Sequence, residues 1–364
     1  MARCKICVMP DTRPDTEFVD GVCSACIAYE QRKLIDWEGR REALLNLLEN
    51  HRRPGGEYDC IVPSSGGKDS TYQVFTLIEL GAKPLVVTAT TCHLTDIGRA
   101  NIDNLARYAT TIEVTPNREV RRMLNRLGLQ MVGDISWPEH VAIFTTPFKI
   151  AVAMNIPLIF YGENPQNQYG GPLDSLDARV MTRRWVSEFG GFLGLRPQDL
   201  VEHVAQIGGT MDDYMPPTAE EIERVGVEGH FLGQYIPWDS RRNARMAIAA
   251  GLKLRENNSP PCYANWWPHE NLDNAQTGLH DWMMFRKYGY GRGCAQISVD
   301  VRTGTVDRAA ALRWVLDHDG AFPDHYMCVH HEKVLDLIEV TPNQLVDIAE
   351  RFTSYRTPSE DGAK

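Results

Sequence analysis

The most informative part of the chain is the stretch Ile61-Val62-Pro63-Ser64-Ser65-Gly66-Gly67-Lys68-Asp69-Ser70. Residues 58–62 are apolar and β-prone, and residues 71–80 carry apolar side chains at helical spacing. Glycine allows backbone angles and close approaches that a Cβ atom would block. The free N–H groups and the dipole of a helix start favour a phosphate there. The stretch therefore predicts a strand, a phosphate-binding turn and a helix.

The glycine spacing differs from that of the P-loop GxxxxGK[ST], in which Lys directly follows the second Gly. Here two adjacent Gly residues precede Lys-Asp-Ser. The run from Ser65 to Ser70 resembles the SGGxDS motif of the PP-loop ATP pyrophosphatases, which bind ATP and cleave it between the α and β phosphates. The resemblance implies that this loop holds the pyrophosphate of ATP. The alternative is an ordinary glycine-rich turn between a strand and a helix.

Length and composition limit the class of protein. The chain has 364 residues, of which 43% are hydrophobic and 24% charged, as in globular proteins of roughly two or three domains. It has no apolar run long enough for a membrane span, and its first residues do not resemble a signal peptide, so we expect a cytoplasmic protein without a membrane partner. The net charge of −10 argues against a nucleic-acid partner. Nine cysteines, an odd number, suit a reducing compartment.

Four of the cysteines form the pattern C-x2-C-x15-C-x2-C: Cys4, Cys7, Cys23 and Cys26. This spacing suits a tetrahedral zinc site built on two knuckles. The polar, proline-rich segment between the two pairs has too few apolar residues to fold without such a staple. Free thiols and an iron–sulfur cluster held by the same sulfurs are the alternatives. A closed shell of four thiolates has no open position for chemistry, so we expect a structural role.

Apolar segments alternate with helical patterns after residue 57. We expect strands at residues 58–62, 84–89, 111–115, 157–161 and 231–238, and helices at 30–51, 71–80, 97–108, 118–127, 141–154, 241–252, 309–316, 333–338 and 344–352. This alternation predicts an α/β fold with a doubly wound, mainly parallel sheet, whose ligand lies at the C-terminal ends of the strands. We expect a zinc knuckle (1–29), a connecting helix and linker (30–56), a PP-loop domain (57–240) and a mostly helical C-terminal region (241–364). The tail from residue 357 is expected to be disordered.

Two polar segments offer contacts to a ligand. The first follows the strand at 157–161 and includes Glu163, whose carboxylate could bind Mg²⁺. The second, residues 265–293, mixes aromatic rings with Asn, Asp, His and Arg, which suits stacking on a sugar and pairing with its hydroxyls. Arg292, between glycines, could clamp a diphosphate. The alternatives are a polar surface loop for the first segment and core packing for the rings of the second.

These features together resemble one branch of the PP-loop enzymes, the N-acetyl sugar amidotransferases of surface-polysaccharide synthesis (the WbpG and PseA type). The resemblance covers nearly the whole chain. It includes the cysteine knuckles, the SGGKDS run, the segments 162–164 and 169–171, the strand around 233–238 and the region from Glu270 to Arg292. The SGGKDS run alone indicates only the superfamily, whereas the distal regions indicate the branch.

The resemblance implies an activity and a set of cofactors. ATP with Mg²⁺ adenylates the acetamido oxygen of an N-acetyl sugar, which is expected to be nucleotide-linked, and ammonia then displaces AMP to leave an acetamidino group. Zinc is expected at the four cysteines. Such chemistry needs positioning and charge stabilisation and no nucleophilic residue. The product belongs to lipopolysaccharide O-antigen or another surface glycan.

The resemblance also assigns roles to individual residues. Lys68 stabilises charge on the leaving pyrophosphate, and Asp69 or Glu163 holds Mg²⁺. The expected ATP contacts, with two strand-end threonines for the adenine, are Ser65, Gly66, Gly67, Lys68, Asp69, Ser70, Thr88, Thr90, Gly162 and Glu163. The expected sugar contacts are Asn164, Gln168, Tyr169, Asn271, Asp273, His280, Asp281 and Arg292.

The resemblance implies a separate class I glutaminase that supplies ammonia, docked through a cyclase-like subunit. No glutaminase motif is recognisable in the chain. The sequence leaves room for a homo-oligomer. The alternative activity is that of a PP-loop tRNA-thiolation enzyme, and the negative net charge and the lack of a CxxC pair within the core argue against it. A non-enzymatic zinc-dependent binding module would not need the intact Lys68-Asp69-Ser70.

Overall fold

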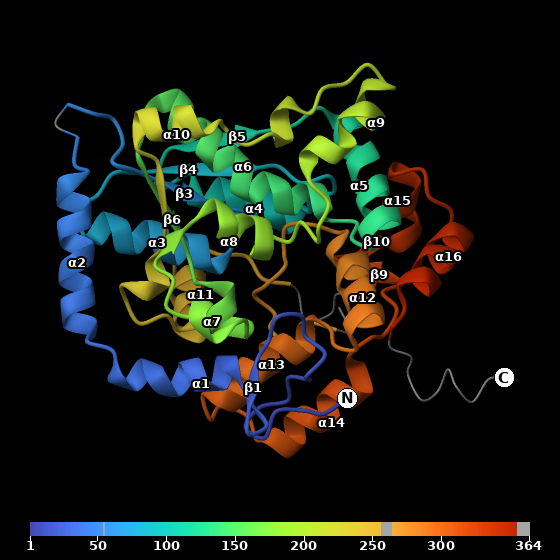
Figure 1. The fold of residues 1–364 in the computed structure, drawn as a ribbon. Helices are drawn as coiled ribbons and strands as arrows, with labels where there is room; N and C mark the ends of the chain where they lie inside the picture. Colours follow the sequence, from blue (N-terminus) through green and yellow to red (C-terminus); the bar gives the residue numbers. More distant parts are fainter. Residues whose placement is uncertain (54, 256–263, 355–364) are drawn as a thin grey trace.

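The computed structural model describes residues 1–53, 55–255 and 264–354, and Figure 1 shows its ribbon. A six-stranded sheet lies at its centre, in the order β5-β4-β3-β6-β8-β7. Five strands run parallel, and short β7 pairs antiparallel with β8 at one edge. The strands are β3 (Cys60–Pro63), β4 (Pro84–Ala89), β5 (Thr111–Val114), β6 (Leu158–Tyr161), β7 (Val180–Met181) and β8 (Glu228–Phe231).

The strand order confirms the doubly wound α/β fold. From β3 the chain moves outward through β4 to β5, then returns to place β6 on the other side of β3. The connections after β3 and β6 therefore leave the sheet in opposite directions. Such a switch point creates a crevice at the C-terminal ends of the strands.

Helices cover both faces of the sheet. Along β3, Cys60 and Val62 pack into one apolar cluster with helices α2 (Trp37–Asn50) and α3 (Lys68–Glu79). Ile61 between them packs into a second cluster with α6 (Trp137–Met154). Successive side chains of a strand point to opposite faces, and burial of both faces explains the continuous apolar strands. The remaining helices of this part are α4 (Asp96–Leu105), α5 (Arg118–Val132), α7 (Pro165–Tyr169), α8 (Arg183–Phe189), α9 (Val201–Ala205), α10 (Ala219–Val225) and α11 (Ser240–Ala249).

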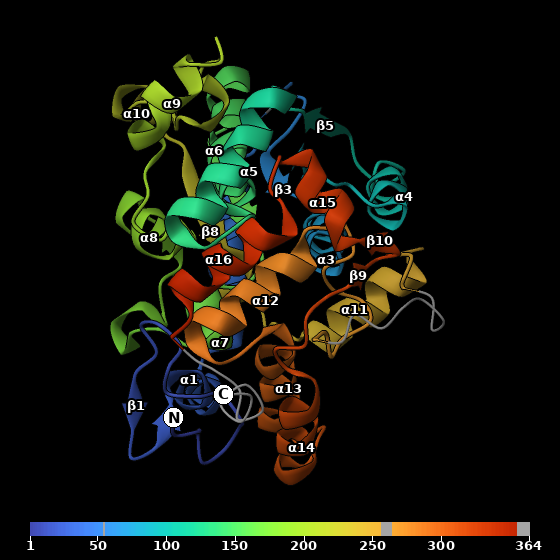
Figure 2. The same cartoon turned by 90° about the vertical axis from the view of Figure 1, so that its right-hand side faces the viewer.

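The C-terminal helices form two groups (Figure 2). Helices α12 (Thr277–Tyr288), α15 (His331–Leu337) and α16 (Pro342–Phe352) pack against Leu129 of α5. Helices α13 (Arg292–Arg302) and α14 (Arg308–His318) instead pack against the N-terminal cysteine segment. A short hairpin of β9 (His325–Tyr326) and β10 (Val329–His330) joins the two groups. The C-terminal region thus contacts both the sheet domain and the cysteine segment.

The prediction of a single helix at residues 30–51 is wrong. The structure has β1 (Phe18–Val19), β2 (Val22–Cys23) and α1 (Ser24–Gln31), a 3-10 turn at Arg32–Leu34, and then α2. The Asp36 carboxylate accepts a hydrogen bond from the Gly39 N–H at 2.9 Å and so caps a new helix. Leu34, expected on the apolar face, is 87% exposed because it lies in the turn.

The strand expected at 231–238 is also displaced. Strand β8 ends at Phe231, and residues Leu232–Gln234 form a 3-10 turn. The Gly233 N–H bonds to the Gly162 carbonyl at 2.9 Å, which turns this segment across the end of β6. Helices α12 and α13 were not expected, since polar and aromatic residues hide their apolar periodicity. The tail from residue 357 lies outside the described residues.

One further fold-level expectation concerns membranes. Across residues 1–53, 55–255 and 264–354, no helix has both the length and the apolar content that a membrane crossing requires.

Candidate functional site

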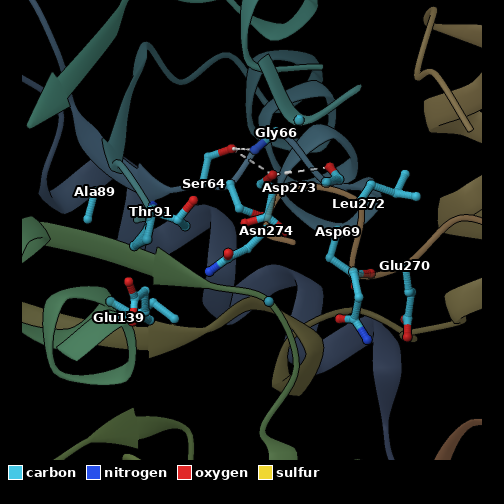
Figure 3. A pocket seen from close by; sticks show the side chains of 18 of the residues that line it. Ser64, Gly66, Asp69, Ala89, Thr91, Glu139, Glu270, Leu272, Asp273 and Asn274 are labelled. Atoms are coloured by element: carbon cyan, nitrogen blue, oxygen red, sulfur yellow. Dashed lines mark hydrogen bonds between the residues drawn. The ribbon is translucent and has the colours of Figure 1, made fainter. Parts of the chain in front are cut away.

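A cavity of about 460 Å³ opens at the C-terminal ends of β3, β4 and β6. The loops that follow these strands line one side of it, and residues 269–274 with parts of α6, α12 and α13 line the other. In Figure 3, Asp69 and Glu270 lie at one side of the cavity and Glu139 at the other. This is the switch-point crevice, where doubly wound sheets bind ligands.

The turn after β3 leads into the first turn of α3, whose backbone N–H groups have no side-chain cap. The Ser64 hydroxyl accepts a hydrogen bond from the Gly66 N–H at 2.9 Å and donates one to Ser70 Oγ at 2.8 Å. Gly67 is the N-cap of α3, and no side chain caps the first turn of that helix. The N–H groups at this helix start therefore remain available to an anion.

Glycine is required at position 66 for two reasons. Its φ angle of +80° lies in the left-handed region that side chains disfavour. A Cβ atom there would also lie 2.7 Å from the backbone nitrogen of Ile102, so α4 packs directly on the turn. The helix thus supports the turn from behind.

The C-terminal region reaches this cavity through a close backbone contact. The Thr95 N–H bonds to the Asp273 carbonyl at 3.0 Å, and the Ala275 N–H bonds to the His93 carbonyl at 3.0 Å. Gly98 of α4 permits the approach, because a Cβ there would lie 2.5 Å from the Asp273 Cα. Residues 270–274 are therefore fixed beside the end of β4.

Lys68 is a buried cation at the centre of the site. Its side chain is 3% exposed, its Nζ lies 2.7 Å from Glu270 Oε1, and it also pairs with Asp69. Gln296 of α13 holds Glu270 in place by donating to its second oxygen at 2.8 Å. Burial would lower the pKa of Lys68, but the carboxylates of Asp69, Glu270 and Glu163 outweigh burial and raise it well above its usual value. The lysine is thus charged at neutral pH.

The carboxyl groups around Lys68 differ in their ionisation. Burial raises the pKa of Glu270, but Lys68 outweighs burial and lowers it below its usual value. Burial, together with the nearby Asp69 carboxylate, raises the pKa of Glu163 to about 7. A second cation at Asp69 and Glu163 would relieve this repulsion, so the pair fits a divalent metal ion.

The opposite wall comes from α6 and α12. Glu139 of α6 accepts hydrogen bonds from Asn125 at 2.8 Å and from Gln276 at 2.9 Å. His280 of α12 lines the cavity, and its Nδ1 lies 2.7 Å from Asp134 Oδ1. These contacts join helices of the sheet domain to the C-terminal region.

The structure brings most of the expected site residues together. The expected residues that line the cavity are Ser65, Gly66, Gly67, Lys68, Asp69, Ser70, Thr90, Gly162, Glu163, Tyr169, Asn271, Asp273, His280 and Arg292. Asp281 does not line it but accepts a hydrogen bond from Arg292 Nε at 3.3 Å. It therefore orients the arginine from behind.

Three expected contacts lie elsewhere. Thr88 is 2% exposed within β4 and does not line the cavity. Asn164 caps α7 by accepting from the Gln166 N–H at 3.0 Å, and its amide donates to the Ser175 carbonyl at 3.0 Å. Gln168 faces a separate cavity and donates to Ser240 at 3.2 Å. The side-chain amides of Asn164 and Gln168 thus bond to the protein itself, and the Thr88 hydroxyl is buried within the strand.

Four residues at the cavity or beside it were not expected there: Glu270, Glu139, Asp134 and His140. Glu270 stands next to Asn271 in a polar segment that was expected to contact the ligand, and this position in the sequence is the signal that could have included it. Asp134 and His140 lie before and within α6, far from any recognisable motif. Only the packing of α6 against α12 shows their relation to His280.

The four N-terminal cysteines converge on one point. Their sulfurs all lie within 4.8 Å of one another, with Cys4 and Cys26 at 3.8 Å and Cys7 and Cys23 at 3.7 Å. Four sulfurs around one tetrahedral ion with bonds of about 2.3 Å stand about 3.8 Å apart. The arrangement therefore fits a single ion such as zinc. The site lies away from the cavity, against α13 and α14.

Comparison with known proteins gives one family match and several similar solved structures. Residues 262–361 match the family model described as "LPS biosynthesis protein WbpG-like, C-terminal domain". Among solved structures, NMN synthetase from Francisella tularensis is 13% identical, with a TM-score of 0.28 over 52% of this chain and 92% of that one. A predicted subunit of tRNA methyltransferase from Methanocaldococcus jannaschii is 14% identical, with a TM-score of 0.24 over 44% and 93%. Comparison with curated protein sequences gives no match.

The strand order, the SGGKDS turn and the buried lysine define an α/β protein of the PP-loop kind. Within that class, the C-terminal segment matches the WbpG-like family model, in agreement with the resemblance seen in the sequence.

Removal of the buried lysine charge tests the electrostatics of the site. Lys68→Met leaves Glu270 and Glu163 buried without their cation, and we expect it to lower the free energy of unfolding at neutral pH by about 3–5 kcal/mol. Because Lys68 lowers the pKa of Glu270, the ion pair contributes fully to the free energy of unfolding above the ordinary carboxyl pKa of 4.5. The contribution is lost as the pH falls through the pKa of Glu270 in the folded protein. Urea denaturation across this pH range measures the difference.

Lys33→Met is the matched control, because Lys33 also pairs with a glutamate but is 64% exposed. We expect little or no change in its unfolding free energy. A Lys68→Met protein as stable as the parent at neutral pH would contradict the buried ion pair.

Loss of one thiolate tests the metal site. We expect Cys23→Ser to lose its bound zinc and to be less stable by several kcal/mol, because metal binding here contributes folding energy. Metal analysis by mass spectrometry and thermal unfolding measure both effects. Cys328→Ser, at an exposed cysteine, should change neither. Equal metal content in the two variants would exclude a four-cysteine site.

Proposed function

We propose that this protein is an ATP-dependent N-acetyl sugar amidotransferase that acts in the synthesis of a surface glycan such as lipopolysaccharide O-antigen. One observation carries the proposal. The WbpG-like segment supplies Glu270, which pairs with the lysine of the SGGKDS turn across the switch-point cavity. An ATP-activating loop and a family-specific segment thus share one site.

The proposed reaction has two steps. The acetamido oxygen attacks the α phosphorus of ATP, a bond between that oxygen and phosphorus forms, and pyrophosphate leaves. The nitrogen of ammonia then attacks the carbonyl carbon of the activated acetamido group. A carbon–nitrogen bond forms, the carbon–oxygen bond breaks, and AMP leaves with the electron pair to give an acetamidine. Activation is needed because an amide is a poor electrophile with a poor leaving group.

The residues of the loop suit the first step. The N–H groups at the start of α3 would hold the β and γ phosphates, and the buried charge of Lys68 would stabilise the leaving pyrophosphate. Asp69 and Glu163 would hold Mg²⁺, which supplies charge stabilisation at the phosphates when bound. Thr90, at the end of β4, lines the cavity and is the remaining candidate for an adenine contact.

The other wall suits a nucleotide-linked sugar. Tyr169, Asn271 and Asp273 present a hydroxyl, an amide and a carboxyl group to the cavity. Burial raises the pKa of Asp273 to about 6, so this group is a stronger proton acceptor than an ordinary aspartate. Arg292, held by Asp281, is placed to bind the diphosphate of a sugar nucleotide.

A product assay tests the proposal directly. The protein would receive ATP, Mg²⁺, ammonium chloride and a panel of UDP-linked N-acetyl sugars, with mass spectrometry of the products. We expect AMP, pyrophosphate and a sugar product in which NH replaces one oxygen atom. In Lys68→Met, which lacks the positive charge in the loop, the rate of this reaction should fall by at least ~100-fold.

A different outcome would favour thiolation. AMP formation with bulk tRNA and a sulfur donor, without turnover of any sugar, would replace the proposal. Cys92, the cysteine next to the cavity-lining Thr91, does not suit sulfur transfer, because burial raises the pKa of its thiol to about 11.

We also propose that a separate class I glutaminase delivers ammonia to this protein, through a cyclase-like subunit. With the three proteins mixed, glutamine should support amidine formation at concentrations where ammonium chloride gives little. The same rate with glutamine whether or not the other subunits are present would contradict this partnership.

A further inference from the structure

Two histidines and one aspartate form a cluster at the wall of the cavity away from Lys68. Asp134 lies between α5 and α6, His140 on α6 and His280 on α12. His280 Nδ1 lies 2.7 Å from Asp134 Oδ1, and His140 Nδ1 lies 3.1 Å from Asp134 Oδ2. Both histidines line the cavity, and their rings meet edge to face with centroids 5.1 Å apart. One buried carboxylate therefore lies beside two imidazoles and is hydrogen-bonded to that of His280.

The hydrogen bond to Asp134 fixes the chemistry of His280. A neutral imidazole that donates through Nδ1 carries its lone pair on Nε2, which makes Nε2 a proton acceptor. When Nε2 is protonated, it can form an ion pair with the Asp281 carboxylate, whose Oδ1 lies 3.9 Å away. The other oxygen of Asp281 is buried and has no hydrogen-bond partner among the described residues. The site can thus hold His280 in both protonation states.

The charges around His280 tune its basicity. Burial lowers its pKa, but Asp134 outweighs burial and, with Asp281, raises the pKa above its usual value. The charged and titratable groups that face it are Asp134, before α6, His140 of α6, Asp281 of its own helix and Arg292 at the start of α13. An oriented and strengthened imidazole at a cavity wall has the properties of a general base.

The two histidines lie against different oxygens of the Asp134 carboxylate. Of the two contacts only that of His280 is a hydrogen bond, because His140 Nδ1 has no hydrogen-bond partner among the described residues. Ser136 N–H donates to Asp134 Oδ1 at 2.8 Å and fixes the carboxylate further. The Asp134 carboxylate is therefore fixed in the position in which it bonds to His280 Nδ1.

We infer that His280, positioned by Asp134, accepts the proton of the attacking nitrogen in the amidation step. This inference rests on the proposed function. As the carbon–nitrogen bond forms, the nitrogen becomes positively charged, and one of its protons passes to Nε2 of His280. The carbon–oxygen bond then breaks, AMP leaves with the electron pair, and the proton returns to the amidine or to solvent. Adenylation of the sugar does not involve this proton.

The experiment separates the two steps in the full-length protein. Pyrophosphate exchange into ATP, dependent on a UDP-linked N-acetyl sugar, reports adenylation without ammonia. Amidine formation from ammonium chloride reports the second step. In His280→Gln, which keeps a donor toward Asp134 but cannot accept a proton, we expect exchange within about threefold of the parent. Amidine formation should fall on the order of 100-fold at neutral pH.

The pH profile gives an independent readout. With the concentration of free NH3 held constant at each pH, amidine formation by the parent should rise with pH through the pKa of His280, and this rise should vanish in His280→Gln. In Asp134→Asn the midpoint should move to lower pH, because the carboxylate that raises the pKa is gone. His318→Gln is the control, since His318 is also half-buried on a helix and bonded through Nδ1. It should change neither step.

The outcomes are distinct. Equal losses of exchange and amidination in His280→Gln, or an unmoved midpoint in Asp134→Asn, would show a merely structural role and overturn the inference. Undiminished amidination in His280→Gln would overturn it while leaving the proposed function intact. A parent protein without sugar-dependent exchange would overturn the proposed function and this inference together.

Discussion

The buried ion pair between Lys68 and Glu270 holds the two parts of the molecule together at their shared site. A lysine at the first turn of α3 can be buried only with carboxylates beside it, because an unpaired charge in this position would be expelled or neutralised. One of these carboxylates comes from the C-terminal region, fixed by Gln296 and by the backbone contact between Thr95 and Asp273. The cavity is complete only when that region is docked.

This dependence explains the arrangement of the rest of the chain. The cysteine segment lies against α13 and α14, and α13 carries Gln296 and begins at Arg292. A metal ion far from the cavity would thus stabilise the helix that positions Glu270 and carries Arg292 at its start. Helix α12, packed on α5, carries His280 to Asp134 by the same kind of docking. Two packing surfaces therefore set the two ends of the site.

Much of the fold could be predicted because its signals are local. The strand expected at 84–89 is β4 (Pro84–Ala89), and the helix expected at 344–352 is α16, which begins two residues earlier at Pro342 after the N-cap Thr341. The failures have local causes as well. Asp36 restarts a helix that looked continuous, and Gly233 turns a segment that looked like a strand. Asn164 and Gln168 look like ligand contacts in sequence, but their amides satisfy the backbone and a neighbouring side chain.

The sequence by itself determined the features that depend on spacing along the chain. These are the SGGKDS turn at the end of a strand, the four cysteines in two pairs and the alternation of strands with helices. Each is set within a few residues, where backbone conformation and periodicity decide the outcome. Tertiary structure alone decided which charges meet. Glu270 opposite Lys68, and Asp134 between His140 and His280, follow from the packing of helices distant in sequence, and electrostatic partners across such distances leave no local pattern.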